Sequence, residues 1–291
     1  MKIGLGAVQF GVNYGVSNIY GKTTKNEASK ILQFAYENGI NVIDTAISYG
    51  NSEDILGEVI TNDDWKIVTK TPCFSDNCLN SRHVKQLQES FNQSLFKLRK
   101  KNIYGLLLHS CDDLFKPGGR LLFQEMERLK SIGMIQKIGV SLYDGKQVDR
   151  LLDNYPIDLV QLPINILDQR LIKGGQLAKL KKYNVEIHAR SAFLQGLLLM
   201  SLNNTPPWFN PVREVLESFH KEAKKRNMTV LQLALSFVQS IDEIDKVIVG
   251  VNTLKQLKEV VNAASIRVNT TELSCMSIDD PVFVNPGNWK T

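Results

Sequence analysis

The feature that most constrains this chain is an eightfold alternation of short apolar runs with amphipathic segments. The runs are near-continuous blocks of Val, Ile and Leu, which is typical of parallel strands buried on both faces. They span Lys2–Val8, Asn41–Thr45, Trp65–Lys70, Ile103–His109, Gln136–Leu142, Asp158–Ile164, Val185–Ser191 and Lys246–Val251. Eight such units over about 250 residues predict a closed (β/α)8 barrel, the TIM-barrel fold.

The segments between the runs have helical periodicity and recognisable ends. Thr23 and Thr24 are candidate N-caps for the first helix, and Gly39 is a candidate C′ residue. The long stretch Pro211–Ile241 predicts two helices that divide near Asn227, with Met228–Thr229 opening the second. The other expected helices are Lys25–Asn38, Ser52–Ile60, Ser81–Lys100, Arg120–Ile132, Gly145–Asn154, Leu171–Tyr183 and Thr253–Ala264.

We expect residues 1–291 to form a single domain, because no linker or shift in composition divides them. Asn203–Pro211 reads as a loop inserted after the seventh strand, and Val268–Thr291 as an irregular tail. A doubly wound open sheet is the competing architecture. It is disfavoured because no G-x-G-x-x-G follows the first strand.

Composition bounds the class of protein. Apolar residues make up 43% and charged residues 22% of the chain, which is typical of a globular domain. No window approaches about 18 apolar residues, and Met1–Gly11 lacks the features of a signal peptide, so we expect a cytoplasmic protein without a membrane partner. The net charge of +5 is mild. We expect no nucleic-acid partner, and a monomer by default.

The cysteines do not indicate a disulfide scaffold or a metal site. Four cysteines in 291 residues are too few for such a scaffold. The spacing of Cys73, Cys78 and His83 matches no common zinc pattern. We therefore expect free thiols and no bound metal.

Titratable residues follow several of the apolar runs, where the active site of a barrel lies. Asp44 and Tyr49 follow the second run, Lys70 ends the third, and His109 ends the fourth. Each alone is also explained as a surface lysine, a turn tyrosine or a core histidine. Their coincidence at one mouth of the barrel favours a catalytic site.

These residue types suit the reduction of a carbonyl group. Hydride addition leaves an alkoxide, and Tyr49 is the candidate general acid if its pKa falls from about 10. We expect the Lys70 ammonium to lower that pKa, and Asp44 to pair with Lys70 and keep it charged. A neutral His109 is expected to orient the carbonyl oxygen beside Tyr49.

The ordered motifs resemble those of the aldo/keto reductase family over almost the whole chain. They begin with GLGAVQFG at Gly4–Gly11 and DTAISYG at Asp44–Gly50. The others are KIVTK ending at Lys70, LLLHS around His109, GVS at Gly139–Ser141, QLPIN at Gln161–Asn165, FLQGLL at Phe193–Leu198 and the Val247–Glu259 segment. The set is specific, although each motif alone is weak.

The resemblance implies an NAD(P)H-dependent reductase of a small-molecule aldehyde or ketone, with NADP(H), or alternatively NAD(H), as cofactor. Tyr49 matches the family's proton donor, and Asp44, Lys70 and His109 match its partners. Ser141 and Gln161 match residues that hold the nicotinamide carboxamide, the Ser191–Gly196 loop matches the pyrophosphate segment, and Gly250–Glu259 matches the adenosine end. The implied cofactor-binding residues are Ser141, Gln161, Arg190, Ser191, Phe193, Gln195, Gly196, Gly250, Asn252, Gln256 and Glu259.

Three regions depart from the family pattern. Leu142 replaces an Asn that contacts the carboxamide in many members. Arg190 replaces a stacked aromatic residue; it is a candidate to stack on the nicotinamide, to reach a substrate phosphate or carboxylate, or to pair with a neighbouring carboxylate. Across Gly250–Gln256 the one cation is Lys255, which predicts a modest NADPH preference, with dual use or NADH use as alternatives.

The mouth of the barrel is expected to be polar. Val8 and Ser110 replace large aromatic residues, and Gln9, Arg190 and Asn165 are polar candidates beside them. This predicts a hydroxylated, sugar-like carbonyl substrate. Trp208 and Trp289 are candidates for a lid.

Two other function classes stay open at this point. One is a regulatory or sensing protein that binds a nicotinamide nucleotide with little turnover. The other is a barrel enzyme in which Lys70 forms a Schiff base with pyridoxal phosphate. Pairing of Lys70 with Asp44 would favour the charged ammonium over that nucleophilic amine.

Overall fold

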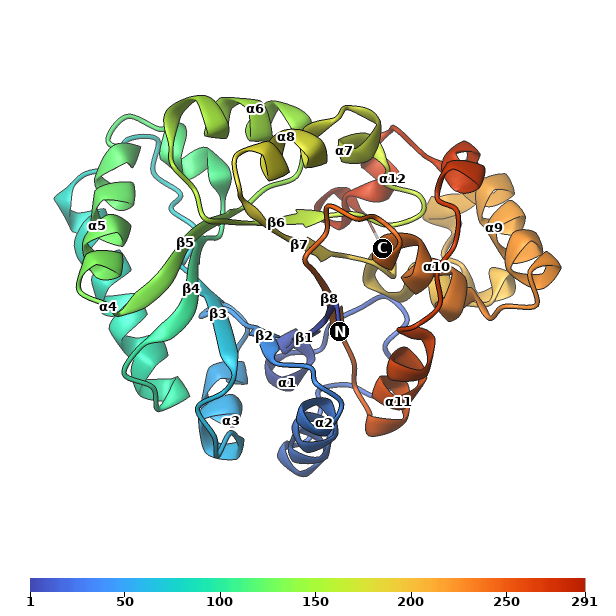
Figure 1. Cartoon of the computed structure of the whole chain (residues 1–291), viewed down its shortest axis with the longest axis horizontal. Helices are drawn as coiled ribbons and strands as arrows, with labels where there is room; N and C mark the ends of the chain where they lie inside the picture. Colours follow the sequence, from blue (N-terminus) through green and yellow to red (C-terminus); the bar gives the residue numbers. More distant parts are fainter. Residues whose placement is uncertain (291) are drawn as a thin grey trace.

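A computed structural model describes residues 1–290 and shows a closed barrel of eight parallel strands (Figure 1). The strands are β1 (Ile3–Gly6), β2 (Val42–Asp44), β3 (Lys66–Lys70), β4 (Ile103–Leu108), β5 (Ile135–Ser141), β6 (Leu159–Pro163), β7 (Glu186–Arg190) and β8 (Lys246–Gly250). Each strand pairs with the next in sequence, and β8 closes the ring on β1. The predicted barrel is therefore confirmed, and the doubly wound alternative is excluded.

Helices surround the strands (Figure 1). The main ones are α2 (Lys25–Glu37), α3 (Ser52–Val59), α4 (Ser81–Leu98), α5 (Gly119–Ser131), α6 (Gly145–Asn154), α9 (Arg213–Lys225), α10 (Val230–Gln239) and α11 (Leu254–Ala263). Thr24 caps α2 by accepting a hydrogen bond from Glu27 N, whereas Thr23 is buried and donates to Asn252 O. Gly39 ends the turn after α2 with a φ of +73°.

Two predicted segments differ from the structure in detail, and a third agrees with it. Leu171–Tyr183 forms two helices, α7 (Arg170–Lys173) and α8 (Gln176–Lys182), because Gly175 adopts a φ of +76° between them. The first run ends as a strand at Gly6, and the chain turns at once into the short helix α1 (Val8–Gly11). As predicted, the long stretch divides at Asn227, and Thr229 caps α10.

The inserted loop and the tail contain more regular structure than predicted. Between β7 and α9 the chain forms three short 3-10 helices, η2 (Leu194–Leu199), η3 (Leu202–Asn204) and η4 (Pro207–Val212). The tail contains η5 (Thr271–Met276), α12 (Pro281–Val284) and η6 (Pro286–Asn288), and Thr291 lies outside the described residues. Within the described part, no helix is long and apolar enough to cross a membrane.

The barrel interior is filled beneath the strand ends. Val68, Leu107 and Leu159 form a buried cluster contributed by β3, β4 and β6. Gly105 makes room for it, since a Cβ atom there would lie 3.2 Å from Leu159. Branched side chains packed in this way support the residues at the strand ends above them.

Candidate active site

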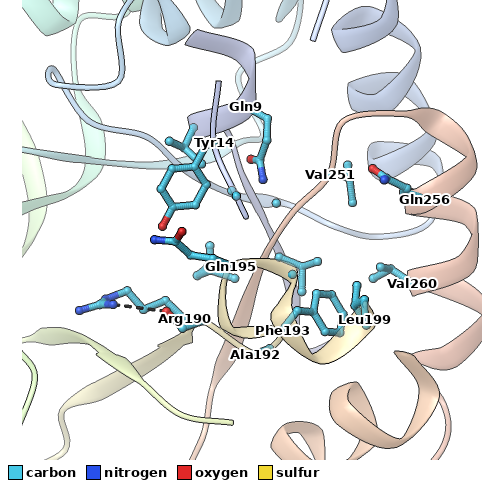
Figure 2. A pocket seen from close by; sticks show the side chains of 18 of the residues that line it. Gln9, Tyr14, Arg190, Ala192, Phe193, Gln195, Leu199, Val251, Gln256 and Val260 are labelled. Carbon is cyan, nitrogen blue, oxygen red and sulfur yellow. Dashed lines mark hydrogen bonds between the residues drawn. The ribbon is translucent and has the colours of Figure 1, made fainter. Parts of the chain in front are cut away.

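A cavity of about 910 Å³ is lined by residues at the carboxyl ends of the strands and by the loops that follow them. Its volume lies within the range of about 300–1,000 Å³ that is usual for small-molecule sites. The four predicted catalytic residues and all eleven implied cofactor-binding residues line this one cavity. Figure 2 shows Arg190 at one side of it and Gln256 and Val260 at the other.

Adjacent strands bring Asp44 and Lys70 together. Asp44 is the last residue of β2 and pairs in register with Val68 of β3, so Lys70 follows two residues later on the same face. Lys70 Nζ lies 2.6 Å from Asp44 Oδ1, and both side chains are almost fully buried. The same ammonium donates to Thr45 O at 3.0 Å and to the Tyr49 hydroxyl at 3.4 Å. This confirms the expected pairing of Asp44 with Lys70.

Tyr49 is held in place by its backbone. Its carbonyl accepts from Ser52 N at 3.1 Å, and its N–H donates to Ala46 O at 3.0 Å. Gly11, the last residue of α1, packs directly on this turn, since a Cβ at Gly11 would lie 1.6 Å from Tyr49 O. The turn therefore depends on two backbones in direct contact.

Gln161, from β6 across the barrel, completes the contacts of Asp44. Its Nε2 donates to Asp44 Oδ1 at 2.7 Å. One donor of the amide is therefore used within the protein, a contact that the implied role in holding a carboxamide did not anticipate. Ser141 ends β5 beside Gln161, with which it pairs in register.

Burial and neighbouring charges set the protonation of this cluster. Burial alone would lower the pKa of Lys70, but the Asp44 carboxylate and the Tyr49 hydroxyl raise it above its ordinary value. Burial raises the pKa of Tyr49 and outweighs the opposite effects of Lys70 and Arg190. The predicted fall in the pKa of Tyr49 is therefore wrong in its net direction, although Lys70 acts as expected. The phenol stays protonated at neutral pH.

His109, which follows β4, faces the Tyr49 ring edge-on, with ring centroids 6.3 Å apart. Burial and then the charge of Lys70 lower the pKa of His109 to about 4, so the imidazole is neutral as expected. Its Nδ1 atom is buried and has no hydrogen-bond partner among residues 1–290. Gln9, which also lines the cavity, has a side-chain oxygen, Oε1, that is likewise buried without a hydrogen-bond partner among these residues. Two such orphaned polar atoms suit a polar ligand.

Arg190 ends β7 at the catalytic side of the cavity. Its guanidinium lies 4.4 Å over the Tyr143 ring, while Nη1 is 3.4 Å from Ser191 Oγ and Nη2 is 3.5 Å from Leu142 O. No carboxylate pairs with Arg190 in the described part of the chain, so the expected alternative of a neighbouring carboxylate is wrong.

The loop after β7 adopts a backbone that suits close approach to a ligand. Ser191, Gln195 and Gly196 all have positive φ, at +61°, +54° and +90°. A second segment packs against this loop: Val16 N donates to Gln195 O at 3.1 Å, and a Cβ at Gly196 would lie 1.8 Å from Ser17 Oγ. The two segments together bound one side of the cavity.

Comparison with known proteins decides the family. The model of the "Aldo/keto reductase family" matches residues 2–277. The chain belongs to the aldo/keto reductase family. It is therefore an oxidoreductase of a family that uses nicotinamide cofactors.

Individual relatives agree with this assignment. The chain is 25% identical to L-galactose dehydrogenase of Arabidopsis thaliana over 94% of its length and 86% of the relative's. It is 24% identical to the NADH-specific methylglyoxal reductase of Escherichia coli (strain K12), covering 83% and 84% of the two chains. The holo form of aldo-keto reductase AKR11C1 from Bacillus halodurans has the same fold, with a TM-score of 0.76 at 20% identity over 94% and 90%.

In this aldo/keto reductase the far end of the cavity lies at the N-terminus of α11. The backbone N–H groups there have partners within the protein: Asn252 and Thr253 donate to Gln256 Oε1, and Leu254 donates to Glu27 Oε1 at 2.7 Å. The N-terminus of α11 thus already has a carboxylate beside it. Lys255 is exposed and does not line the cavity.

Sequence reasoning missed part of the lining. Tyr14, Gly15, Ser17 and Asn18, from the segment between α1 and α2, line the cavity, as does Thr229–Gln232 at the start of α10. The signal was faint, because the segment 13–21 has no apolar periodicity and reads as an ordinary loop. Gly15 was the best sign in the sequence that this segment packs closely on another. Its φ is +102°, and a Cβ atom added there would lie 3.1 Å from Gln195 O.

Some expected features of the mouth lie elsewhere. Val8 and Gln9 line the cavity, whereas Ser110 and Asn165 do not. Asn165 is fully buried and donates to Ser191 O, so it supports the loop after β7. Trp289 packs edge-on against Phe209, and Trp208 lines a separate hollow that shares Tyr14, Gly15 and Gln195 with the main cavity.

Proposed function

We propose that this chain reduces a polar aldehyde or ketone to the alcohol with a nicotinamide cofactor, and that Tyr49 is the proton donor. The observation that carries the proposal is the position of Lys70 Nζ, which contacts both Asp44 Oδ1 and the Tyr49 hydroxyl inside the cavity. The nicotinamide, when bound, supplies the hydride. The residues of the chain supply the proton and the orientation.

Each side chain has a distinct part in this proposal. The protonated Tyr49 phenol donates its proton to the oxygen of the reduced carbonyl, and Lys70 stabilises the phenolate that remains. Asp44 keeps Lys70 charged and fixed, and Gln161 holds Asp44. The neutral His109 donates a hydrogen bond to the carbonyl oxygen. These pairings favour the charged Lys70 ammonium and not the Schiff-base chemistry considered from the sequence.

The residues present fit a nicotinamide dinucleotide along the cavity. Ser141 and Gln161 lie at the catalytic end, the positive-φ loop Ser191–Gly196 lies in the middle, and Asn252, Gln256 and Glu259 lie at the far end. In the proposal these residues hold the carboxamide, the pyrophosphate and the adenosine respectively. Arg190 and Phe193 lie between the first two groups.

Tryptophan fluorescence during titration with NADH or NADPH tests the proposal, together with turnover of small polar aldehydes. Tyr49→Phe is expected to bind the cofactor like the native protein and to lose at least 100-fold in kcat, because it lacks the proton to donate. Tyr183→Phe, at an exposed position outside the cavity, is the matched control. Retention of kcat in Tyr49→Phe, or binding of neither cofactor by the native protein, would contradict the proposal.

We further propose that NADPH is preferred over NADH by less than tenfold, if at all. Among the lining residues the cations Lys70 and Arg190 lie at strand ends β3 and β7, whereas α11 contributes Glu259. The Glu27 carboxylate beside Leu254 N opposes a second anion at that helix end. The NADH specificity named for the Escherichia coli relative is in line with this.

Glu27→Gln tests the cofactor preference, because a side-chain amide oxygen still accepts from Leu254 N without the charge. We expect the dissociation constant for NADPH to fall relative to that for NADH, by up to about fivefold for a partly exposed charge. A native preference for NADPH above tenfold, or an unchanged ratio in the variant, would contradict the argument.

A further inference from the structure

Arg190 is a charge without a counter-charge at the catalytic end of the cavity. Four charged residues line the cavity: Asp44, Lys70, Arg190 and Glu259. Asp44 and Lys70 neutralise each other at 2.6 Å, and Glu259 belongs to α11 at the far end. Within residues 1–290 the guanidinium has no carboxylate partner. The catalytic end therefore carries one net positive charge.

The contacts of Arg190 leave most of its donors free for a ligand. A guanidinium has five N–H donors, and the protein takes up two of them through long contacts of 3.4 and 3.5 Å. The Tyr143 ring covers one face and limits the motion of the group. Figure 2 shows the Arg190 side chain extended at the side of the pocket opposite Gln256 and Val260. Such a fixed, planar edge is suited to two oxygens of one anion.

The guanidinium is also close enough to influence the reacting groups. Its charge contributes to lowering the pKa of His109, and it opposes the rise in the pKa of Tyr49. Arg190, Tyr49 and His109 line the same cavity, so an anion held at Arg190 shares that cavity with a carbonyl at Tyr49. A carbonyl at Tyr49 and an anion at Arg190 can belong to the same substrate.

We propose that Arg190 determines substrate specificity by binding an anionic group, a carboxylate or a phosphate, on the carbonyl substrate. The inference rests on the proposed function and narrows its polar substrate to an anionic one. The reaction at the carbonyl is unchanged, and the anion takes no part in the transfer of the hydride or the proton. Tyr143 serves as a positioning residue for the guanidinium.

Matched substrate pairs test the inference. Turnover of 4-oxobutanoate is compared with that of butanal, and turnover of glycolaldehyde phosphate with that of glycolaldehyde. One charge-assisted, bidentate contact predicts that the native kcat/KM is about 10- to 100-fold higher for the anionic member of at least one pair, mainly through KM. The pair that shows the difference identifies carboxylate or phosphate as the preferred group.

The variants separate recognition of the anion from other roles of Arg190. In Arg190→Gln the ratio of anionic to neutral kcat/KM is expected to fall to about one, and Arg190→Lys is expected to restore part of it, because it keeps the charge without the fork. Lys146→Gln is the matched control, since it removes one charge from an exposed position on α6 outside the cavity. It should leave the ratio unchanged.

A binding measurement makes the result independent of turnover. Calorimetry with 4-hydroxybutanoate against 1-butanol, and with 2-hydroxyethyl phosphate against ethane-1,2-diol, is expected to show the same preference and the same loss in Arg190→Gln. Equal binding and equal turnover of anionic and neutral members would overturn the inference and leave the proposed function standing. A parallel loss for both members, together with weaker cofactor binding, would place Arg190 at the cofactor and also overturn it. Failure of every carbonyl to turn over, with anion binding intact, would instead contradict the proposed function.

Discussion

Replacement of Asp44 by Asn removes the charge that neutralises Lys70 while it preserves the shape of the site. The side-chain exposures of Lys70 and Asp44 are 1% and 6%, so water has little access to either group. An amide oxygen at position 44 can still accept from Lys70 Nζ and from Gln161 Nε2. The perturbation is therefore almost purely one of charge.

The magnitude follows from burial. Removal of one partner from a buried ion pair costs about 3–5 kcal/mol, because the other charge stays buried without compensation. Without Asp44, burial is the largest remaining effect on Lys70 and lowers its pKa. The folded variant then binds fewer protons than the unfolded chain between that lowered pKa and about 10.4, so its stability rises with pH in this window. In the native protein the raised pKa keeps the contribution of Lys70 constant up to about pH 10.

Urea unfolding followed by circular dichroism at pH 7 and pH 9.5 measures both effects. We expect Asp44→Asn to lose about 3–5 kcal/mol at pH 7 and less at pH 9.5. Lys70→Met alone should be similarly costly, since it leaves the Asp44 carboxylate buried. The double variant should lose clearly less than the sum of the two, because neither charge remains.

The outcome that would refute this reasoning is specific. A loss below about 1 kcal/mol at pH 7, the value for a solvated pair, would mean that water reaches Lys70. An equal loss at both pH values would mean that the pKa of Lys70 does not depend on Asp44. Additive losses in the double variant would mean that the two groups do not interact.

Two other predictions follow from the site. Because burial depresses the pKa of His109 to about 4, the free energy of unfolding of the native protein should decrease as pH falls from about 6.5 to about 4. In urea titrations across that range, His109→Gln should reduce the dependence of this free energy on pH by close to one proton. An unchanged pH dependence would show that His109 is not the group responsible. Gly11→Ala would place a Cβ 1.6 Å from Tyr49 O and should lower kcat by about 10- to 100-fold through displacement of the Tyr49 turn. Gly133→Ala is the comparison there, since its Cβ meets nothing within 4 Å and the φ of +74° costs stability alone; equal kcat in both variants would contradict the argument.

The pattern of residues predicted the barrel and much of the cavity wall. The period and the apolar content of a segment are local properties, so the positions of the eight strands could be predicted to within a few residues. A barrel places the carboxyl ends of all its strands at one mouth. This is why Asp44, Tyr49, Lys70 and His109 could be grouped from positions that are far apart in sequence. The structure brings Asp44 and Tyr49 to Lys70 Nζ and places the His109 ring edge-on to the Tyr49 ring.

Other features of the site depend on contacts between distant segments, and no local pattern reports these. The packing of Ser17 on Gly196 and the Glu27 carboxylate beside Leu254 N are of this kind. So is the pKa of Tyr49, because the depth of burial and the distance to Lys70 decide its direction together.

The sequence by itself determined which residue types stand at the strand ends, because the periodicity of apolar residues and the order of the strands follow from the chain alone. Those residue types in turn indicated the class of chemistry. Only the tertiary structure decided how those groups are partnered. Asp44 accepts from Gln161 as well as Lys70, whereas Arg190 stacks on Tyr143 and finds no carboxylate among residues 1–290. The physical reason is that charge compensation depends on distances of a few ångströms across the barrel, and these exist only once the ring of strands has closed.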